Sequence, residues 1–335
     1  ITYKYGKKIN SAYLKKDLNK KKSVEDAKNF SLNIKPGINI KNCPICSRKK
    51  NKYLQTIYGF TYYECVDCGV AYVSNMPEEI EVEKIYGTEY YNTMNKTLLA
   101  NDSIIDYRVE NIAKPKVEYV LKNLTTNKKS WLDIGCGVGE ILSVASAAGW
   151  DTLGIETNGL EREYGIKKFG LKIIQEYIGQ TNIHKYSNKF GVISLFGVLE
   201  HLRNPHSIIN SISLLQKQGD NLIIETPHFP SISAICQIFF PDSVDRVMHP
   251  PLHLFLFSLK SLETLLKVYK YKINHAWFFG QDFYEFLSDI ALHMDGFNNS
   301  ILYDKLSLLI NDLQRAIDNH QLSDEILIIS EKTSS

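Results

Sequence analysis

The chain has 335 residues, 44% of them hydrophobic, which is enough to bury one large core or two moderate ones. It contains no run of 18 apolar residues and no signal peptide, which excludes a transmembrane helix and makes a cytoplasmic protein without a membrane partner the expectation. The net charge of +2 hides an asymmetry, because residues 1–52 hold 14 Lys and one Arg against three acids.

Residues 1–40 form a Lys-rich N-terminal arm. A basic arm can attract nucleic acid or the phosphates of an activated sugar. The alternative is a solvated, mobile extension. The sequence favours this alternative, because no aromatic residue is interleaved with the lysines between Lys15 and Lys22.

Residues 41–75 are predicted to form a zinc ribbon. Two C-x2-C pairs, separated by 18 residues, supply Cys43, Cys46, Cys65 and Cys68. Four thiolates fill the tetrahedral coordination of Zn2+, so the predicted role of the metal is structural and not catalytic. The segments on either side of Gly59 are expected to pair as a hairpin. Two disulfides are the alternative, but they suit a secreted protein, and the chain has no secretory features.

Residues 76–128 are expected to be a helical, Tyr-rich linker. A short helix is predicted at 78–85, and a longer helical pattern covers 103–124. Pro115 interrupts the longer pattern, which predicts either two helices or one kinked helix.

The next stretch predicts a nucleotide pocket. Residues 131–140 read as a strand, a tight turn with glycines at 135, 137 and 139, and the start of a helix. Glycine allows positive φ and lets a ligand lie against the backbone, while the free N–H groups of a helix start favour electron-rich groups. A second strand at 152–155 ends in Glu156, an acid placed to accept both hydroxyls of a ribose.

The rest of the chain is expected to complete an α/β domain. Further strands are predicted at 172–178, at 190–196 just before Glu200 and His201, and at 221–227. Residues 228–252 form a long insert that is expected to act as a lid. Ser258 is expected to cap a helix at 259–269. The last two strands are predicted at 271–279 and 324–332. Between them lies a helical insert, residues 281–320, with helices at 283–293 and 300–319, which would form a lid wall or a dimer surface. The chain is expected to be a monomer or a homodimer.

Three motifs in this order, LDIGCGVGE from Leu132, GIE from Gly154 and FGVISLFGVLEHLRNP from Phe190, resemble the class I S-adenosylmethionine-dependent methyltransferases. Dinucleotide-binding dehydrogenases prefer GxGxxG, whereas this turn is GxGxG. The resemblance implies a Rossmann-like three-layer α/β sandwich over residues 129–335, with a seven-stranded, mostly parallel sheet whose last strand is antiparallel. It also implies methyl transfer from S-adenosylmethionine to oxygen, nitrogen or carbon, leaving S-adenosylhomocysteine.

The resemblance also implies the cofactor site. The acid at 133 would orient the turn, the glycines would lie along methionine and ribose, and Glu156 would hold the ribose hydroxyls. Tyr177 stands where an acid is often found, and Tyr86, Tyr90 and Tyr91 would lie near the pocket. The full set of implied cofactor contacts is Asp133, Gly135, Cys136, Gly137, Gly139, Glu156, Thr157, Tyr177, Phe196 and Leu199. Cys136 and Cys236 are expected to be packed residues and not nucleophiles.

The segment His253-Leu-Phe-Leu-Phe-Ser258 resembles the His-Leu-x-x-Phe-Ser signature of small-molecule methyltransferases related to sugar-modifying enzymes. This resemblance implies His253 as a candidate base, beside Glu200 and His201 near the transferred methyl; a histidine there acts as a base or braces the loop. The expected substrate is a small molecule, preferably a sugar or nucleotide-linked sugar.

Two alternatives remain for the function. An RNA methyltransferase is suggested by the basic arm, the ribbon, and Glu200 and His201 with His249 and His253. In the small-RNA 2′-O-methyltransferases that such a cluster resembles, a further acid ligates the metal, and Gly197 stands in its place here. The other alternative is a non-catalytic binding module in which the cofactor pocket is vestigial.

Overall fold

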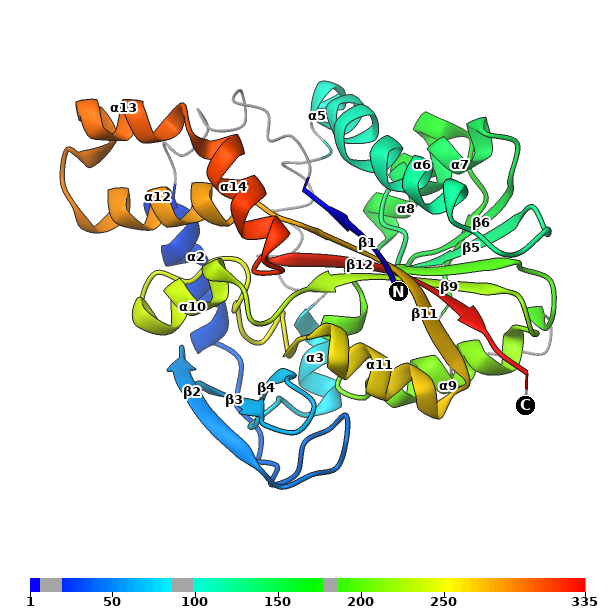
Figure 1. The fold of residues 1–335 in the computed structure, drawn as a ribbon, viewed down its shortest axis with the longest axis horizontal. Coiled ribbons are helices and arrows are strands. Elements are labelled where there is room, and N and C mark those ends of the chain that lie inside the picture. The colour runs from blue at the N-terminus through cyan, green and yellow to red at the C-terminus, as the bar shows by residue number, and fades with distance from the viewer. Residues whose placement is uncertain (7–19, 86–98, 100, 177–185, 335) are drawn as a thin grey trace.

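The structure is a computed structural model that describes residues 1–6, 20–85, 99, 101–176 and 186–334. Within these residues an eight-stranded sheet crosses the molecule, in the order β1-β11-β12-β9-β8-β5-β6-β7 (Figure 1). Along the chain its strands are β1 (Thr2–Tyr5), β5 (Ser130–Ile134), β6 (Asp151–Ile155), β7 (Ile173–Ile174), β8 (Val192–Phe196), β9 (Asn221–Pro227), β11 (Tyr271–Phe279) and β12 (Glu325–Lys332).

Strand β12 runs antiparallel to both of its neighbours, whereas the other pairs of neighbours in this sheet are parallel. The predicted fold class is therefore confirmed, with β1 as an unpredicted eighth strand beside β11. Strand β9 is buried along its whole length, as expected for a strand with both faces covered.

Helices cover both faces of the sheet (Figure 1). One face carries α5 (Asp102–Arg108), α6 (Lys114–Lys122), α7 (Glu140–Ala147) and α8 (Gly159–Phe169). The other carries α9 (Pro205–Leu215) and α11 (Leu259–Val268), and α3 (Glu79–Ile85) lies on the same side of the sheet. Within the described part of the chain, no helix has the length and apolar character needed to cross a bilayer.

The cysteine-bearing segment forms a second sheet that the main domain completes. Its order is β10-β4-β3-β2, with β2 at Asn51–Ile57, β3 at Phe60–Cys65, β4 at Ala71–Val73 and β10 at Phe255–Leu256. The predicted hairpin around Gly59 is thus present. Strand β10 comes from the segment that follows the lid insert, and one hydrophobic core includes residues of both sheets. The ribbon and the α/β domain therefore share their packing.

The N-terminal arm is not a mobile extension in its described parts, so that expectation was wrong for residues 1–6 and 20–40. Strand β1 pairs with β11, and α2 (Lys20–Leu32) packs against α12 (Asp282–His293). The Lys20 ammonium lies 2.7 Å from Asp245 and 3.0 Å from Glu285. For α2 the physical reason is charge pairing, because acids of the main domain neutralise a lysine that composition alone places in water, whereas residues 2–5 are held by strand pairing.

Replacing Lys20 with alanine is expected to lower the free energy of unfolding by about 3 kcal/mol. The change leaves the nearly buried Asp245 carboxylate without its cation, whereas Glu285 keeps Arg246 at 3.2 Å, and breaking a buried ion pair costs about 3–5 kcal/mol. Urea unfolding of the variant measures the loss, and Lys21→Ala, at an exposed position of the same helix, is the matched control. Equal stabilities for the two variants would contradict the prediction.

The structure adds detail to three other expectations. Of the two alternatives for 103–124, it shows one continuous helical run, in which a five-residue π-helix, Val109–Ala113, joins α5 to α6. Its wider turns end just before Pro115, which cannot donate to an α-helical ladder. The helix expected at 300–319 is two, α13 (Ile301–Ser307) and α14 (Ile310–Asn319). The lid insert contains its own helix, α10 (Ile232–Phe239).

Candidate functional site

The glycine turn joins β5 to α7 as predicted. Gly135 has φ +69° and Gly139 has φ +81°, which only glycine adopts without strain. Neighbouring side chains also require the missing Cβ, which at Gly135 would lie 2.6 Å from Val198 Cγ2 and at Gly139 would overlap Leu171 Cδ1. The amides of Gly135 and Cys136 donate to the Ile155 carbonyl, so the turn is fastened to the end of β6.

Glu156 follows β6 and points at this turn. Its carboxylate accepts hydrogen bonds from the Gly137 amide at 2.9 Å and from the Asn158 amide at 2.7 Å. The residue is buried, and half-buried Thr157 lies directly after it. Because each carboxylate oxygen has two lone pairs, Glu156 can still accept from a ligand lying on the turn. The structure therefore brings the predicted ribose acceptor to the predicted turn.

Asp133 is buried beneath the turn. Its carboxylate accepts from the Ser194 hydroxyl at 2.5 Å, and Ser194 accepts from the Trp131 indole N–H at 2.7 Å. This chain of hydrogen bonds ties β5 to β8. Burial raises the pKa of Asp133 to about 7 from its ordinary 3.8.

The raised pKa of Asp133 predicts a pH-dependent stability. Between pH 4 and 7 the folded state holds a proton that the unfolded state has lost, so the free energy of unfolding falls as pH rises, by up to ~4 kcal/mol from this group. Asp133→Asn removes this dependence. The melting temperature of the variant minus that of the native protein should therefore increase from pH 5 to pH 8. Asp312→Asn, at an exposed position, should not. A constant difference between the Asp133 variant and the native protein would contradict the prediction.

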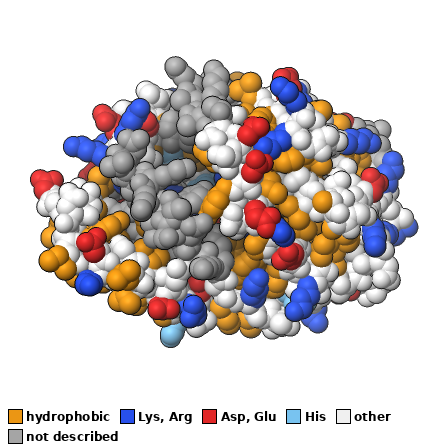
Figure 2. Space-filling view, turned by 90° about the horizontal axis from the view of Figure 1, so that it is seen from above, with side chains coloured by type: hydrophobic (Ala, Val, Ile, Leu, Met, Phe, Trp, Pro, Cys, Tyr) orange, Lys and Arg blue, Asp and Glu red, His pale blue; other side chains and the backbone are white. Residues whose placement is uncertain are grey.

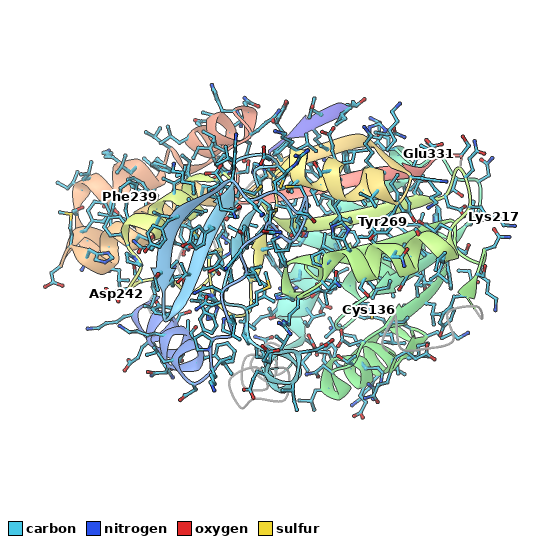
Figure 3. The ribbon with its side chains drawn as sticks, turned by 90° about the horizontal axis from the view of Figure 1, so that it is seen from below. Cys136, Lys217, Phe239, Asp242, Tyr269 and Glu331 are labelled. Carbon is cyan, nitrogen blue, oxygen red and sulfur yellow. The ribbon has the colours of Figure 1, made fainter. Side chains whose placement is uncertain are left out.

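The other implied cofactor contacts are placed less completely. Cys136, labelled in Figure 3, lies in the turn, and burial raises the pKa of its thiol well above the ordinary value, which fits packing and not nucleophilic attack. Half-buried Phe196 ends β8, and buried Leu199 begins a 3-10 turn, Leu199–His201. Tyr177 lies outside the described residues, as do Tyr86, Tyr90 and Tyr91.

The three candidate catalytic residues lie together after β8. Each offers a ligand-type atom, and these atoms of Glu200, His201 and His253 lie within 4.8 Å of one another. The Glu200 carboxylate is buried, accepts from the Thr226 hydroxyl at 3.2 Å and lies 3.7 Å from His201 Nε2. Burial raises the pKa of Glu200 and lowers the pKa of His253 well below 6.5, so His253 is neutral at pH 7.

Glu225, which the sequence analysis missed, is a buried acid near the candidate catalytic residues. It pairs in register with Phe196, at the same edge of the sheet. Its Oε1 atom lies 2.6 Å from Lys116 Nζ, whereas Oε2 is buried and has no hydrogen bond within the described residues. The sequence signal for Glu225 is an acid in the mostly apolar run Leu222-Ile-Ile-Glu-Thr226. Burying a carboxylate in a strand is costly, so such residues are rare unless they are paired or functional.

The four ribbon cysteines converge as their spacing predicted. Cys43 and Cys68 Sγ lie 3.7 Å apart, and Cys46 and Cys65 Sγ lie 3.5 Å apart. These distances exceed a disulfide bond of about 2.05 Å, and all four thiols are free. A tetrahedral ion with bonds of about 2.3 Å holds its sulfurs about 3.8 Å apart, so the cluster fits Zn2+.

Comparison with known proteins gives the family. The methyltransferase domain profile matches residues 105–276, just over half of the chain. The ubiquinone biosynthesis O-methyltransferase of Methylococcus capsulatus is 23% identical over 116 residues, a match that covers 33% of this chain and 48% of that protein, about half its length.

Solved structures similar in fold include the magnesium protoporphyrin IX methyltransferase of Synechocystis PCC 6803, at 11% identity and TM-score 0.49, covering 76% of this chain and all of that one. Another is an S-adenosylmethionine-dependent methyltransferase of Archaeoglobus fulgidus, at 16% identity and TM-score 0.45, covering 73% and 100%. On the evidence of the sequence profile, with the glycine turn in place, the chain belongs to the methyltransferase domain family.

Proposed function

We propose that this chain transfers the methyl group of S-adenosylmethionine to a hydroxyl of a small polar molecule, preferably a sugar or a nucleotide-linked sugar. One observation carries the proposal: the glycine turn with Glu156 lies at the same sheet edge as a polar wall formed by Glu200, Glu225, His201 and His253. The turn on which the cofactor would lie and the side chains that would bind hydroxyl groups are thus both at the carboxyl ends of parallel strands.

The cofactor would lie on the turn. Positive φ at the glycines exposes backbone against which the methionine and ribose can rest, and Glu156 would accept from both ribose hydroxyls. Phe196 and Leu199 would face the sulfonium, because they follow at the end of β8. Cys43, Cys46, Cys65 and Cys68 would hold a structural Zn2+, which has no open position for a substrate once four thiolates bind it.

The acceptor side would favour a hydroxyl-rich molecule. Glu225 Oε2 accepts no hydrogen bond within the described residues, and an apolar substrate would leave this buried oxygen unpaired at a cost of about 1–3 kcal/mol. The sulfonium is already activated, so the protein aligns the hydroxyl in line with the carbon–sulfur bond and removes its proton. Glu200, His201 and His253 would line the side on which that proton leaves. The curated relative is an O-methyltransferase by name, which supports oxygen as the acceptor atom.

The experiment is a transfer assay with isotope-labelled methyl donor against free sugars, nucleotide-linked sugars, catechols and RNA. Labelled sugar product is the expected result, and labelled RNA would favour the alternative. The described side chains do not favour RNA as the substrate. Acids and bases are interspersed on the face in Figure 2. His249, one of the histidines that suggested RNA, packs against Phe30 of α2 with ring centroids 5.9 Å apart. Absence of S-adenosylmethionine binding would favour a non-catalytic module.

Glu225→Gln is expected to lower kcat/KM for the accepted sugar about tenfold while leaving cofactor affinity unchanged. The variant keeps an oxygen for Lys116 but loses the charge that strengthens a hydrogen bond to the substrate, about 1.5 kcal/mol. The control is Glu331→Gln, on β12 at the opposite end of the sheet (Figure 3). If the two variants have the same kcat/KM, Glu225 does not contact the acceptor.

A further inference from the structure

The strongest unexplained feature is the geometry of the cluster formed by Glu200, His201 and His253. The ligand-type atoms of these residues lie within 4.8 Å of one another, although they come from two separate loops. His201 and His253 have ring centroids 5.1 Å apart. Within the described residues, Glu200 has one basic neighbour within ion-pair distance, His201, whose Nε2 lies 3.7 Å from Glu200 Oε1.

Hydrogen bonds fix the tautomer of both rings. His201 Nδ1 lies 2.7 Å from the Leu252 carbonyl oxygen, and His253 Nδ1 lies 2.8 Å from that of Val247. A carbonyl can only accept, so each Nδ1 carries the hydrogen and donates it. In a neutral imidazole the other nitrogen, Nε2, then carries a lone pair. His201 Nε2 lies 3.7 Å from Glu200 Oε1, and a ligand-type atom of His253 lies within 4.8 Å of both groups, so a cation placed among the three residues would be stabilised.

The surroundings resemble those of metal ligands in a second respect. A histidine that binds a metal through one nitrogen commonly donates its other N–H to a carbonyl, as both rings do here, and a ligating carboxylate is itself hydrogen-bonded. Glu200 accepts from the Thr226 hydroxyl at 3.2 Å. Glu200 is buried, whereas His201 and His253 are partly exposed, so a bound ion would keep positions open on their side.

We infer that Glu200, His201 and His253 bind one divalent transition-metal cation, such as Mn2+ or Zn2+, with open coordination positions for oxygens of the acceptor. Two imidazoles and one carboxylate suit these cations, in contrast to the four thiolates of the ribbon, which close their site.

The catalytic consequence rests on the proposed function. A cation next to an acceptor hydroxyl lowers the pKa of that hydroxyl. The hydroxyl proton passes to solvent, its oxygen forms a bond to the methyl carbon, and the carbon–sulfur bond breaks with its electron pair left on sulfur. The three residues would then act by holding the cation, and none of them would need to be the base itself.

Mn2+ titration of the whole protein, purified with its ribbon zinc in place, tests the inference. Loss of the free-ion electron paramagnetic resonance signal counts bound Mn2+, and one ion per chain is expected. Glu200→Gln and His253→Gln should each weaken binding at least tenfold. His320→Gln is the matched control, because its Nδ1 also bonds a carbonyl, that of Ala316, but at an exposed position on the surface. Melting curves and zinc content show whether the variants are folded.

The titration of the native protein needs no variant. If no Mn2+ binds up to millimolar concentration, or if both ligand variants bind it as tightly as the native protein, the inference is overturned. Methyl transfer that proceeds without any bound Mn2+ would support the proposed function and contradict the inferred role of the cation. Stoichiometric Mn2+ binding without binding of S-adenosylmethionine would support the metal site and contradict the proposed function, so the two failures are distinguishable.

Discussion

Cys43→Ser is expected to destabilise the whole molecule and not only the ribbon. Loss of a structural zinc site removes about 10 kcal/mol of binding energy, which is comparable to the whole stability of a typical domain, about 5–15 kcal/mol. The loss should spread because β10 of the α/β domain belongs to the ribbon sheet. In addition, Ser258, which caps α11, donates from its hydroxyl to the Cys68 carbonyl at 2.8 Å.

Thermal unfolding followed by circular dichroism measures this effect. The variant should lose the cooperative transition or shift it far below that of the native protein, and a strong zinc chelator should have the same effect on the native protein. The matched control is Cys236→Ser, at a half-buried cysteine of α10 outside the cluster, which should keep the native transition. If Cys43→Ser kept the native transition of the α/β domain, the two sheets would be energetically independent.

Glu156→Ala is expected to weaken binding of S-adenosylhomocysteine by 100-fold or more. In the proposed site the change would remove two hydrogen bonds from ribose hydroxyls to a charged group, each worth about 1.5–3 kcal/mol. It also frees the Gly137 amide, whose hydrogen bond to Glu156 holds the turn. Calorimetric titration measures the dissociation constant.

The control for this variant is Glu163→Ala, at an exposed position of α8. It should bind the product with native affinity. Should Glu156→Ala bind within threefold of the native protein, the carboxylate does not hold the ribose, and the cofactor lies elsewhere.

The glycine turn and the cysteine cluster were predictable because local chemistry determines them. Positive φ at Gly135 and Gly139 requires glycine at those positions, and each C-x2-C pair places two thiols close together on one short turn. Strands β5, β6, β8 and β9 were predictable as well, since buried parallel strands are nearly continuous apolar runs, whereas the edge strand β1 was not predicted.

Non-local pairings were not predictable. Strand β10 has only two residues, too few for a periodic pattern, and it forms only because β4 lies beside it. Lys20 belongs to a Lys-rich segment that composition places in solvent, yet its partners, Asp245 and Glu285, come more than 200 residues later. The same limit applies in the site, where the sequence supplied Glu200, His201 and His253 but not their mutual distances.

A crystal structure of the complex with S-adenosylhomocysteine tests the proposed site most directly. We predict that both ribose hydroxyls lie within hydrogen-bond distance of the Glu156 carboxylate, with the sulfur directed toward the carboxyl end of β8. A product molecule bound away from the glycine turn, or a nicotinamide dinucleotide in its place, would contradict the assignment.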